Sequence, residues 1–270
     1  MSSWTIGTFG TNGIRIQYLR TGGAKPPLIL LHGLSGSGAC WGPLARALED
    51  EYDVVMPDAR GHGGTSTPPS GYRYEDFAGD VVGLINGLGL VDPILLGHSM
   101  GGMTAAVVAT RSAPKIRALI LADPTFLDPD RQREVYESGL ADQHRRFLGL
   151  AKDEALAEVR VRYARRDPEL IGLTVAARMN TRAVAFEVLA PPNPEYRGLI
   201  AGIRIPTLLV IPQKGVVSKE TAQELKNLNP GLYVEQILQA GHGLQYDQPK
   251  RFEMTVASFL RSLPRYHSSL

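Results

Sequence analysis

The stretch with the clearest chemical potential is Gly97-His98-Ser99-Met100-Gly101, which follows an apolar run and precedes a helix-like run. Glycines two residues before and two residues after the serine leave room for backbone around a strained turn. A strand that turns sharply into a helix lifts a serine hydroxyl clear of a sheet, as the G-x-S-x-G nucleophile elbow requires. The pattern therefore predicts that Ser99 is a nucleophile.

Two backbone N–H groups near this serine are candidates for an oxyanion hole. The N–H of Met100 would lie at a helix N-terminus, where developing negative charge is stabilised. The segment His32-Gly33-Leu34 ends a buried apolar run, and Gly33 lets the backbone approach a bound carbonyl. The N–H of Leu34 is therefore the expected second donor, whereas His32 is expected to bond loop backbone.

The expected general base is His242, which lies in a Gly-His-Gly loop after the last predicted strand. The flanking glycines let the ring approach another loop closely, and the chain order Ser…His matches the elbow fold. Asp58 and His62 are expected to tie down a Gly-rich loop beside the site. Together these residues predict acyl transfer, with Ser99 as nucleophile and His242 as base.

The elements that must position these residues alternate between strands and helices. Two strands, at 4–9 and 13–20, flank an Asn-Gly turn, which predicts an antiparallel hairpin. Further strands are expected at 28–31, 53–57, 93–97, 115–122, 205–211 and 232–238, and helices at 40–50, 74–89, from the elbow to 112, 219–228 and 249–263. This alternation predicts an α/β fold: a mostly parallel, twisted, eight-stranded sheet with helices on both faces.

The character of the chain changes between 124 and 202, where charge rises and no strand pattern is visible. Composition and spacing predict three or four helices there, forming a cap (lid) inserted into a core made of 1–123 and 203–270. The cap is expected to cover Ser99 and line an apolar pocket, with as candidates Phe126, Leu127, Tyr136, Met179, Phe186 and Val188, and Val217 from the core.

Arginine clusters within the predicted cap lie at 131–133, 145–146 and 160–166. Runs of charge on a helix usually form its solvated face, and we expect the same here. Binding of an acidic substrate by these arginines is the alternative.

Bulk composition is that of a globular protein, and 270 residues suffice for one large α/β domain with an insertion. A formal net charge of +2 is too close to neutral to indicate a nucleic-acid partner. The single cysteine, Cys40, allows no internal disulfide and no cysteine-based zinc site, and no metal or organic cofactor is expected. A homodimer is compatible with the sequence, which does not determine the oligomeric state.

Targeting signals are not evident in the sequence. The N-terminus has no basic stretch followed by an apolar run, and no apolar run is long enough to span a membrane, so a cytoplasmic location is expected. The last three residues, Ser268-Ser269-Leu270, lack the central lysine of a peroxisomal signal.

Taken together, the motifs resemble the α/β-hydrolase-fold superfamily, and within it the lid-bearing serine esterases, lactonases and C–C hydrolases. The resemblance covers nearly the whole chain and is carried by the elbow, by Gly241-His242, by His32-Gly33 and by Asp58-Ala59-Arg60-Gly61-His62-Gly63. It implies a Ser-His-acid triad. In most such relatives the acid follows the strand that matches 207–211, but here no carboxylate occurs before Glu220.

A histidine base still needs a carboxylate, which fixes its tautomer and stabilises the imidazolium. The end of the preceding strand offers Asp123, and haloalkane dehalogenases and zearalenone-type lactonases resemble such an arrangement. Asp123 is therefore the predicted acid, with Asp247, Glu220 or no acid at all as the alternatives.

The predicted function is that of a serine hydrolase that cleaves a small apolar carboxylic ester or lactone through an acyl-enzyme. The predicted triad is Ser99, His242 and Asp123. Four alternatives stay open: a C–C bond hydrolase, a perhydrolase, a non-catalytic small-molecule receptor, and a cofactor-free dioxygenase in which the His–Asp pair deprotonates substrate.

Overall fold

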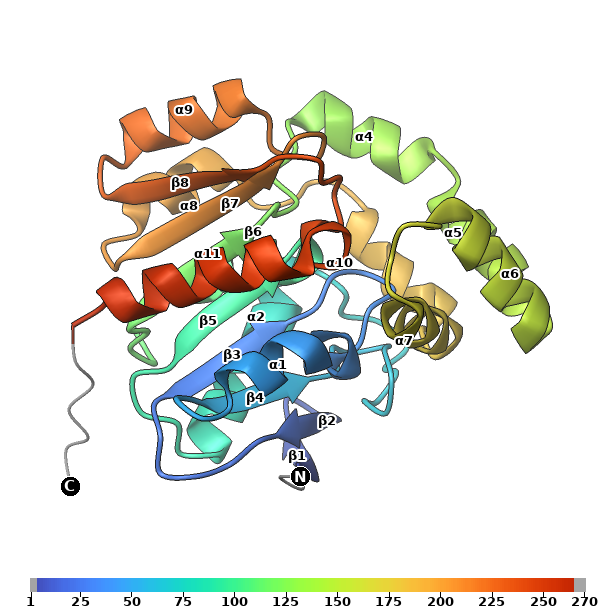
Figure 1. Cartoon of the computed structure of the whole chain (residues 1–270), viewed down its shortest axis with the longest axis horizontal. Coiled ribbons are helices and arrows are strands. Elements are labelled where there is room, and N and C mark those ends of the chain that lie inside the picture. Colours follow the sequence, from blue (N-terminus) through green and yellow to red (C-terminus); the bar gives the residue numbers. More distant parts are fainter. Residues whose placement is uncertain (1–3, 265–270) are drawn as a thin grey trace.

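An eight-stranded sheet runs through the centre of the molecule (Figure 1). The computed structural model describes residues 4–264, so the C-terminal tripeptide and the first three residues lie outside the described residues. The strands are β1 (Thr5–Thr11), β2 (Ile14–Arg20), β3 (Pro27–Leu31), β4 (Asp53–Pro57), β5 (Ile94–His98), β6 (Ala118–Ala122), β7 (Thr207–Pro212) and β8 (Leu232–Ile237).

The spatial order of the strands is β1-β2-β4-β3-β5-β6-β7-β8. β2 is antiparallel to both β1 and β4, whereas every other neighbouring pair is parallel. This confirms the predicted mostly parallel sheet with an antiparallel hairpin at one edge. The sites of catalysis in such sheets lie beyond the carboxyl ends of the parallel strands.

Strands β3 to β7 are buried along their whole length because helices cover both faces of the sheet. Side chains alternate between the faces, so Leu28 and Leu30 pack on one side and Ile29 and Leu31 on the other. One face carries α1 (Gly42–Leu48) and α11 (Pro249–Ser262), seen in front in Figure 1; the opposite face carries α2 (Tyr74–Gly87), α3 (Met100–Ala109), α8 (Tyr196–Gly202) and α9 (Lys219–Leu228).

The chain between β6 and β7 is helical, and most of it projects from one end of the sheet (Figure 1). It contains α4 (Pro129–Glu137), α5 (Leu140–Leu148), α6 (Lys152–Arg162), α7 (Pro168–Met179), a 3-10 helix η2 (Ala183–Leu189) and α8. This is five α-helices where three or four were expected, because short turns such as that at Gly139, with its left-handed backbone, divide the helical composition into shorter pieces.

The helices α5, α6 and α7 bury a small apolar cluster of their own, formed by Phe147, Ala155, Val159, Ile171 and Val175. In contrast, α8 packs against α3 and α9 and contributes to the apolar layer on the sheet. The split of the chain into a core and a cap at 124–202 stays a prediction, and below "the cap" denotes α4 to η2.

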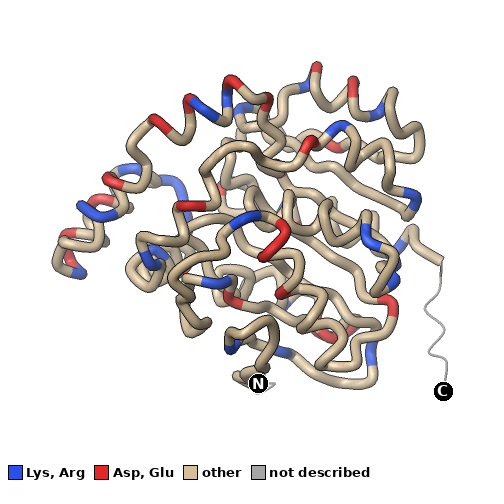
Figure 2. The backbone as a smooth tube through the Cα atoms, turned by 180° about the vertical axis from the view of Figure 1, so that it is seen from behind, with Lys and Arg blue, Asp and Glu red and all other residues tan. Residues whose placement is uncertain are grey.

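Charged residues follow one another along the helices of the cap, with Lys and Arg in blue and Asp and Glu in red in Figure 2. Several of its arginines form exposed ion pairs, as between Arg146 and Glu158 (2.8 Å) and between Arg131 and Glu134 (2.5 Å). These arginines form the solvated face that the sequence predicts. Within residues 4–264, no helix combines the length and the apolar character needed to cross a bilayer.

Candidate active site

Ser99 occupies the turn between β5 and α3, in the strained geometry of a nucleophile elbow. Its backbone angles are φ 54° and ψ −118°, a left-handed φ that costs a side-chain-bearing residue about 1–3 kcal/mol. The turn is so tight that a Cβ on Gly97 would collide with the carbonyl of Gly101. The Ser99 N–H donates to Ala122 O at 3.1 Å, which ties the turn to β6 and helps offset the strain.

The side chains of Ser99, His242 and Asp123 form one continuous hydrogen-bonded relay. His242 Nε2 lies 2.9 Å from Ser99 Oγ, and His242 Nδ1 lies 2.6 Å from Asp123 Oδ2. An ionised carboxylate only accepts, so Nδ1 carries the proton and Nε2 is free to accept the serine proton. The structure thus brings together three side chains from widely separated segments, as predicted; their catalytic roles stay a prediction.

Asp123 follows β6 directly and is fully buried, with a left-handed φ of 41°. Besides His242, its carboxylate accepts hydrogen bonds from the N–H groups of Val216 (3.0 Å) and Val217 (2.9 Å). These two residues belong to the loop after β7, the position at which the resemblance implies an acid. The loop therefore provides donors that stabilise a carboxylate supplied by the neighbouring strand.

The two alternative acids lie in other surroundings. Asp247 accepts from Gly241 N (2.9 Å) and from Arg166 Nε (2.8 Å), so it fixes the backbone next to His242 rather than its ring. Glu220 is exposed in the first turn of α9. Among residues 4–264, Asp123 is the carboxylate that contacts the His242 ring.

The predicted oxyanion donors lie on either side of Ser99. Met100 is the first residue of α3, and N–H groups of a first helical turn have no partner within the helix. The loop that contains Leu34 passes against the elbow, since a Cβ on Gly33 would lie 3.1 Å from Ser99 Cβ. In the described part of the chain, no protein acceptor bonds the Leu34 N–H. Oxyanion binding by the two groups stays a prediction.

Two buried histidines hold the loops beneath this site. His32 accepts from Ala59 N at 2.9 Å and donates from Nδ1 to Gly33 O at 2.8 Å. His62 accepts from Ser35 N at 3.2 Å and donates to a backbone carbonyl. Burial lowers the pKa of His62 to about 3, so the ring is neutral at physiological pH. Both histidines bond loop backbone and neither reaches the relay.

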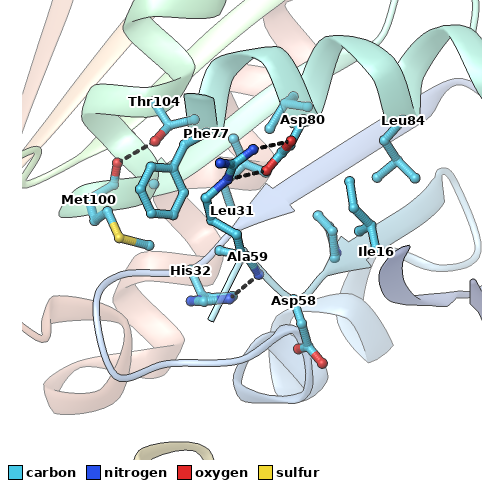
Figure 3. A pocket seen from close by; sticks show the side chains of 14 residues that line it. Ile16, Leu31, His32, Asp58, Ala59, Phe77, Asp80, Leu84, Met100 and Thr104 are labelled. Carbon is cyan, nitrogen blue, oxygen red and sulfur yellow. Dashed lines mark hydrogen bonds and ion pairs between the residues drawn. The ribbon is translucent and has the colours of Figure 1, made fainter. Parts of the chain in front are cut away.

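A small apolar cavity of about 30 Å³ lies behind these loops (Figure 3). Its wall includes the buried ion pair between Arg60 and Asp80, whose closest atoms are 2.6 Å apart. Asp58 lies nearby and accepts from the N–H groups of Gly38 (2.8 Å) and Gly64 (3.0 Å). The cavity is too small for a substrate and holds no part of the relay. The contacts of Asp58 hold the Gly-rich loop in place, as the sequence predicts.

His98, the residue before Ser99, has a role that the sequence analysis missed. It is buried, and its Nε2 donates to the backbone carbonyl of His242 at 2.7 Å. Burial lowers the pKa of His98 well below its usual value, which keeps the ring neutral. The carbonyl of His242 can only accept, so the proton lies on Nε2. His98 therefore positions the His242 backbone, just as Asp123 orients the ring. The signal in the sequence that could have indicated this role is the position of His98, a polar ring directly next to Ser99 in the elbow motif.

A cavity of about 890 Å³ opens between the cap and the His242 loop. Of the seven side chains expected to line an apolar pocket, its lining includes Phe186. Phe126 stacks on Tyr196, Tyr136 is exposed on α4, and the remaining four lie elsewhere: Val188 and Val217 in the core, Met179 against the cap cluster and Leu127 in a separate cleft. The lining is instead rich in arginine, and three of these residues, Arg162, Arg165 and Arg166, belong to the cluster at 160–166 that was expected to form a solvated face. For Arg166, whose side chain is only 8% exposed, that expectation is wrong.

Cys40 also lines the large cavity, but it is not an activated nucleophile. Burial raises the pKa of the Cys40 thiol, which therefore stays protonated at neutral pH. Among residues 4–264, no three His, Cys, Asp or Glu side chains cluster in a way that could hold a metal ion. Ser99 is thus the nucleophile candidate that the geometry activates.

A family model described as the alpha/beta hydrolase fold matches residues 26–249. The match includes the elbow, the loop of Leu34 and the His242 loop, and it spans most of the chain. The chain therefore belongs to the α/β-hydrolase-fold family.

Several known proteins resemble the chain over most of its length. It is 29% identical over 273 aligned positions to the N-formylmaleamate deformylase of Pseudomonas putida, covering 94% of this chain and 96% of that protein. It is 27% identical over 252 positions to the sn-1-specific diacylglycerol lipase ABHD11 of Mus musculus, covering 87% of this chain and 81% of that protein. The crystal structure of E-2-(acetamidomethylene)succinate hydrolase shares the fold, with a TM-score of 0.84 at 20% identity, covering 96% of this chain and 100% of that one.

The packing around Asp123 yields a first prediction. A Cβ on Gly215 would collide with Asp123 Oδ2, so Gly215→Ala must displace either the carboxylate or the loop that bonds it. Because a misplacement of about 1 Å can cost on the order of 100-fold in rate, we expect kcat to fall by about that factor. Ester hydrolysis measures the effect, with Gly202→Ala as the control, since a Cβ there meets no atom within 4 Å. Equal kcat values for both variants would contradict the assigned geometry.

A second prediction concerns His62 and pH. The pKa of His62 is about 3 in the folded chain against 6.5 unfolded, so the unfolded state binds the extra proton first as pH falls. The stability that His62 contributes is complete above pH 6.5 and declines between 6.5 and 3, by about 1.4 kcal/mol per pH unit. The free energy of unfolding, measured with urea between pH 7 and pH 4, should therefore decrease less steeply with falling pH for His62→Asn than for the wild-type chain. Equal decreases in the two chains would show that His62 titrates normally.

Proposed function

We propose that this chain is a serine hydrolase that cleaves a carboxylic ester or lactone through an acyl-enzyme on Ser99. The observation that carries the proposal is the relay from the buried Asp123 through His242 to Ser99, with contacts of 2.6 and 2.9 Å. The mouse relative, named a diacylglycerol lipase, supports ester cleavage by this family.

The relay supports a two-stage mechanism. His242 Nε2 takes the proton of Ser99 Oγ as that oxygen attacks the substrate carbonyl carbon, and Asp123 stabilises the imidazolium that forms. The N–H groups of Leu34 and Met100 bind the oxyanion, for which each such donor contributes about 3–4 kcal/mol. His242 then protonates the leaving group, and afterwards activates the water that hydrolyses the acyl-enzyme.

Amide cleavage is a second candidate for the same machinery. The Pseudomonas relative is named a deformylase of an N-formyl compound, and 94% of this chain aligns with it. Cleavage of an N-acyl bond needs the same nucleophile and oxyanion donors, with a nitrogen leaving group that His242 protonates. A receptor without turnover fits less well, because the complete relay would have no use there.

The nucleophile is tested by covalent labelling. A fluorophosphonate should label the wild-type chain at Ser99, and Ser99→Ala should abolish both labelling and hydrolysis of 4-nitrophenyl esters. Mass spectrometry of the adduct identifies the residue, and Ser35→Ala, which changes a nearby loop serine, serves as the control. Labelling that persists in Ser99→Ala would refute the proposed nucleophile.

The acid is tested by Asp123→Asn, which keeps the shape of the side chain but removes its charge. We expect kcat to fall on the order of 10⁴-fold, because the amide no longer enforces the tautomer that accepts the serine proton. Asp247→Asn is the matched control and should retain far more activity, since Asp247 bonds Gly241 N rather than the His242 ring. Similar losses in both variants would remove Asp123 from its assigned role.

A further inference from the structure

Arginine side chains dominate the charge of the large cavity beside His242. Its lining includes Arg162, Arg165, Arg166 and Arg178, whereas Asp247 is the acidic residue among the lining side chains of the described chain. A concave wall with this excess of positive charge favours anionic ligands over neutral ones. The expected small apolar substrate does not account for it.

The four arginines are not equivalent, because Arg166 is already neutralised. Its Nε donates to Asp247 at 2.8 Å, and its side chain is only 8% exposed. The guanidinium also lies over the Tyr163 ring, 3.7 Å from its centre, which fixes its plane. Arg166 thus links the cap to the His242 loop, and the carboxylate of Asp247 balances its charge.

Arg178 is partly buried in the last turn of α7 and lacks such compensation. Its guanidinium lies over the Phe147 ring at 3.8 Å, and among residues 4–264 no carboxylate lies within ion-pair distance of it. The carboxylate of Glu158 acts on it from farther away but is bonded to Arg146 at 2.8 Å. Burial lowers the pKa of Arg178, the expected effect of desolvating a cation without a paired anion.

We propose that Arg178 binds a carboxylate of the substrate, so that the natural substrate is an anionic ester or amide rather than an apolar one. The planar guanidinium presents two parallel donors that match a carboxylate, and the Phe147 ring beneath it holds it in place. Gly33, Leu34 and His242 line the same cavity, so an anion on Arg178 shares one space with the proposed base and with the loop of the proposed oxyanion donor. Ser99 is not part of this lining, but His242 Nε2 lies 2.9 Å from its Oγ. The role in turnover rests on the proposed function, whereas anion binding does not.

Binding without turnover is the direct test. Calorimetry of the full chain with glutarate should give measurable binding, and neutral glutaramide should bind far more weakly. Arg178→Met, which keeps an apolar contact with Phe147, should weaken glutarate binding by about 10- to 100-fold, the effect of losing a charge-assisted hydrogen-bonded pair. Arg178→Lys keeps the positive charge but lacks the planar pair of donors, so its affinity for glutarate should lie between those of the wild-type chain and Arg178→Met.

The matched control is Arg160→Met. Arg160 is exposed on the same cap, in α6, and lies outside the cavity lining, so this variant loses one positive charge without touching the site. It should bind glutarate as the wild-type chain does. Circular dichroism of each variant reports whether the cap helices remain folded.

Turnover supplies the second test, in which charged and neutral esters are compared by their specificity constants. The ratio of kcat/KM for 4-acetoxybenzoate to that for its methyl ester reports the effect of a charge on the leaving group. The ratio of kcat/KM for mono-4-nitrophenyl adipate to that for 4-nitrophenyl hexanoate reports the effect of a charge on the acyl group. Intrinsic reactivities cancel when each ratio is compared between variants. At least one ratio should fall tenfold or more in Arg178→Met and stay unchanged in Arg160→Met.

The outcomes separate the two proposals. Failure of the wild-type chain to bind glutarate, equal binding by Arg178→Met and Arg160→Met, or ratios unaffected by Arg178→Met would each overturn the anion site. Glutarate binding that depends on Arg178, in a chain that hydrolyses none of the four esters, would instead refute the proposed hydrolase while supporting the anion site.

Discussion

The hydrogen bond between His242 Nδ1 and the buried carboxylate of Asp123 is the interaction on which the rest of the site depends. It fixes the imidazole tautomer, and therefore which nitrogen faces Ser99 Oγ 2.9 Å away. A buried carboxylate is costly unless its oxygens are bonded, and here two N–H groups of the loop after β7 complete the set. The end of β6 thus supplies the carboxylate, and the loop after β7 supplies the N–H groups that stabilise it.

Short polar contacts of the same kind hold the neighbouring loops. His98 bonds the carbonyl of His242, and Asp247 bonds the N–H of Gly241, so the backbone at and before the His242 ring is fixed. His32 and His62 do the same for the segment that carries Leu34. His32, His62 and His98 are buried, and burial lowers the pKa of each, so each of these three rings is neutral and can donate from one nitrogen and accept at the other. A rigid frame of this kind is what the proposed oxyanion donors and the proposed nucleophile need in order to stay in place before a substrate arrives.

The cap divides its arginines between two tasks. Those on the outer surface pair with neighbouring acids, whereas those on the inner surface face the cavity beside His242. Arg166 is paired with Asp247, whereas Arg178 stacks on Phe147 and has no ion-pair partner among residues 4–264. This contrast separates a structural link from the proposed binding group. The chemical character of the pocket is therefore basic, although the cap's own interior is apolar.

Local patterns in the sequence determined the fold class, the order of buried strands along the chain, and the identities of Ser99 and His242 as candidates. A turn signal, a run of apolar residues or a glycine-flanked serine has the same meaning wherever the chain folds, because its cause is local backbone geometry. The departure from the family's usual acid position was also visible in the sequence, and it pointed to Asp123.

Only the tertiary structure decided which carboxylate contacts His242, that His98 holds its backbone, and which side chains line the cavity. Six of the seven expected pocket residues lie elsewhere, because an apolar residue in a cap helix packs equally well against the core, its own helices or a ligand. Contacts such as those between Val216 or Val217 and Asp123 use backbone N–H groups. Every residue except proline carries such a group, so the residue type does not predict these contacts. The sequence determines what each segment can form, and the packing of distant segments determines which groups meet.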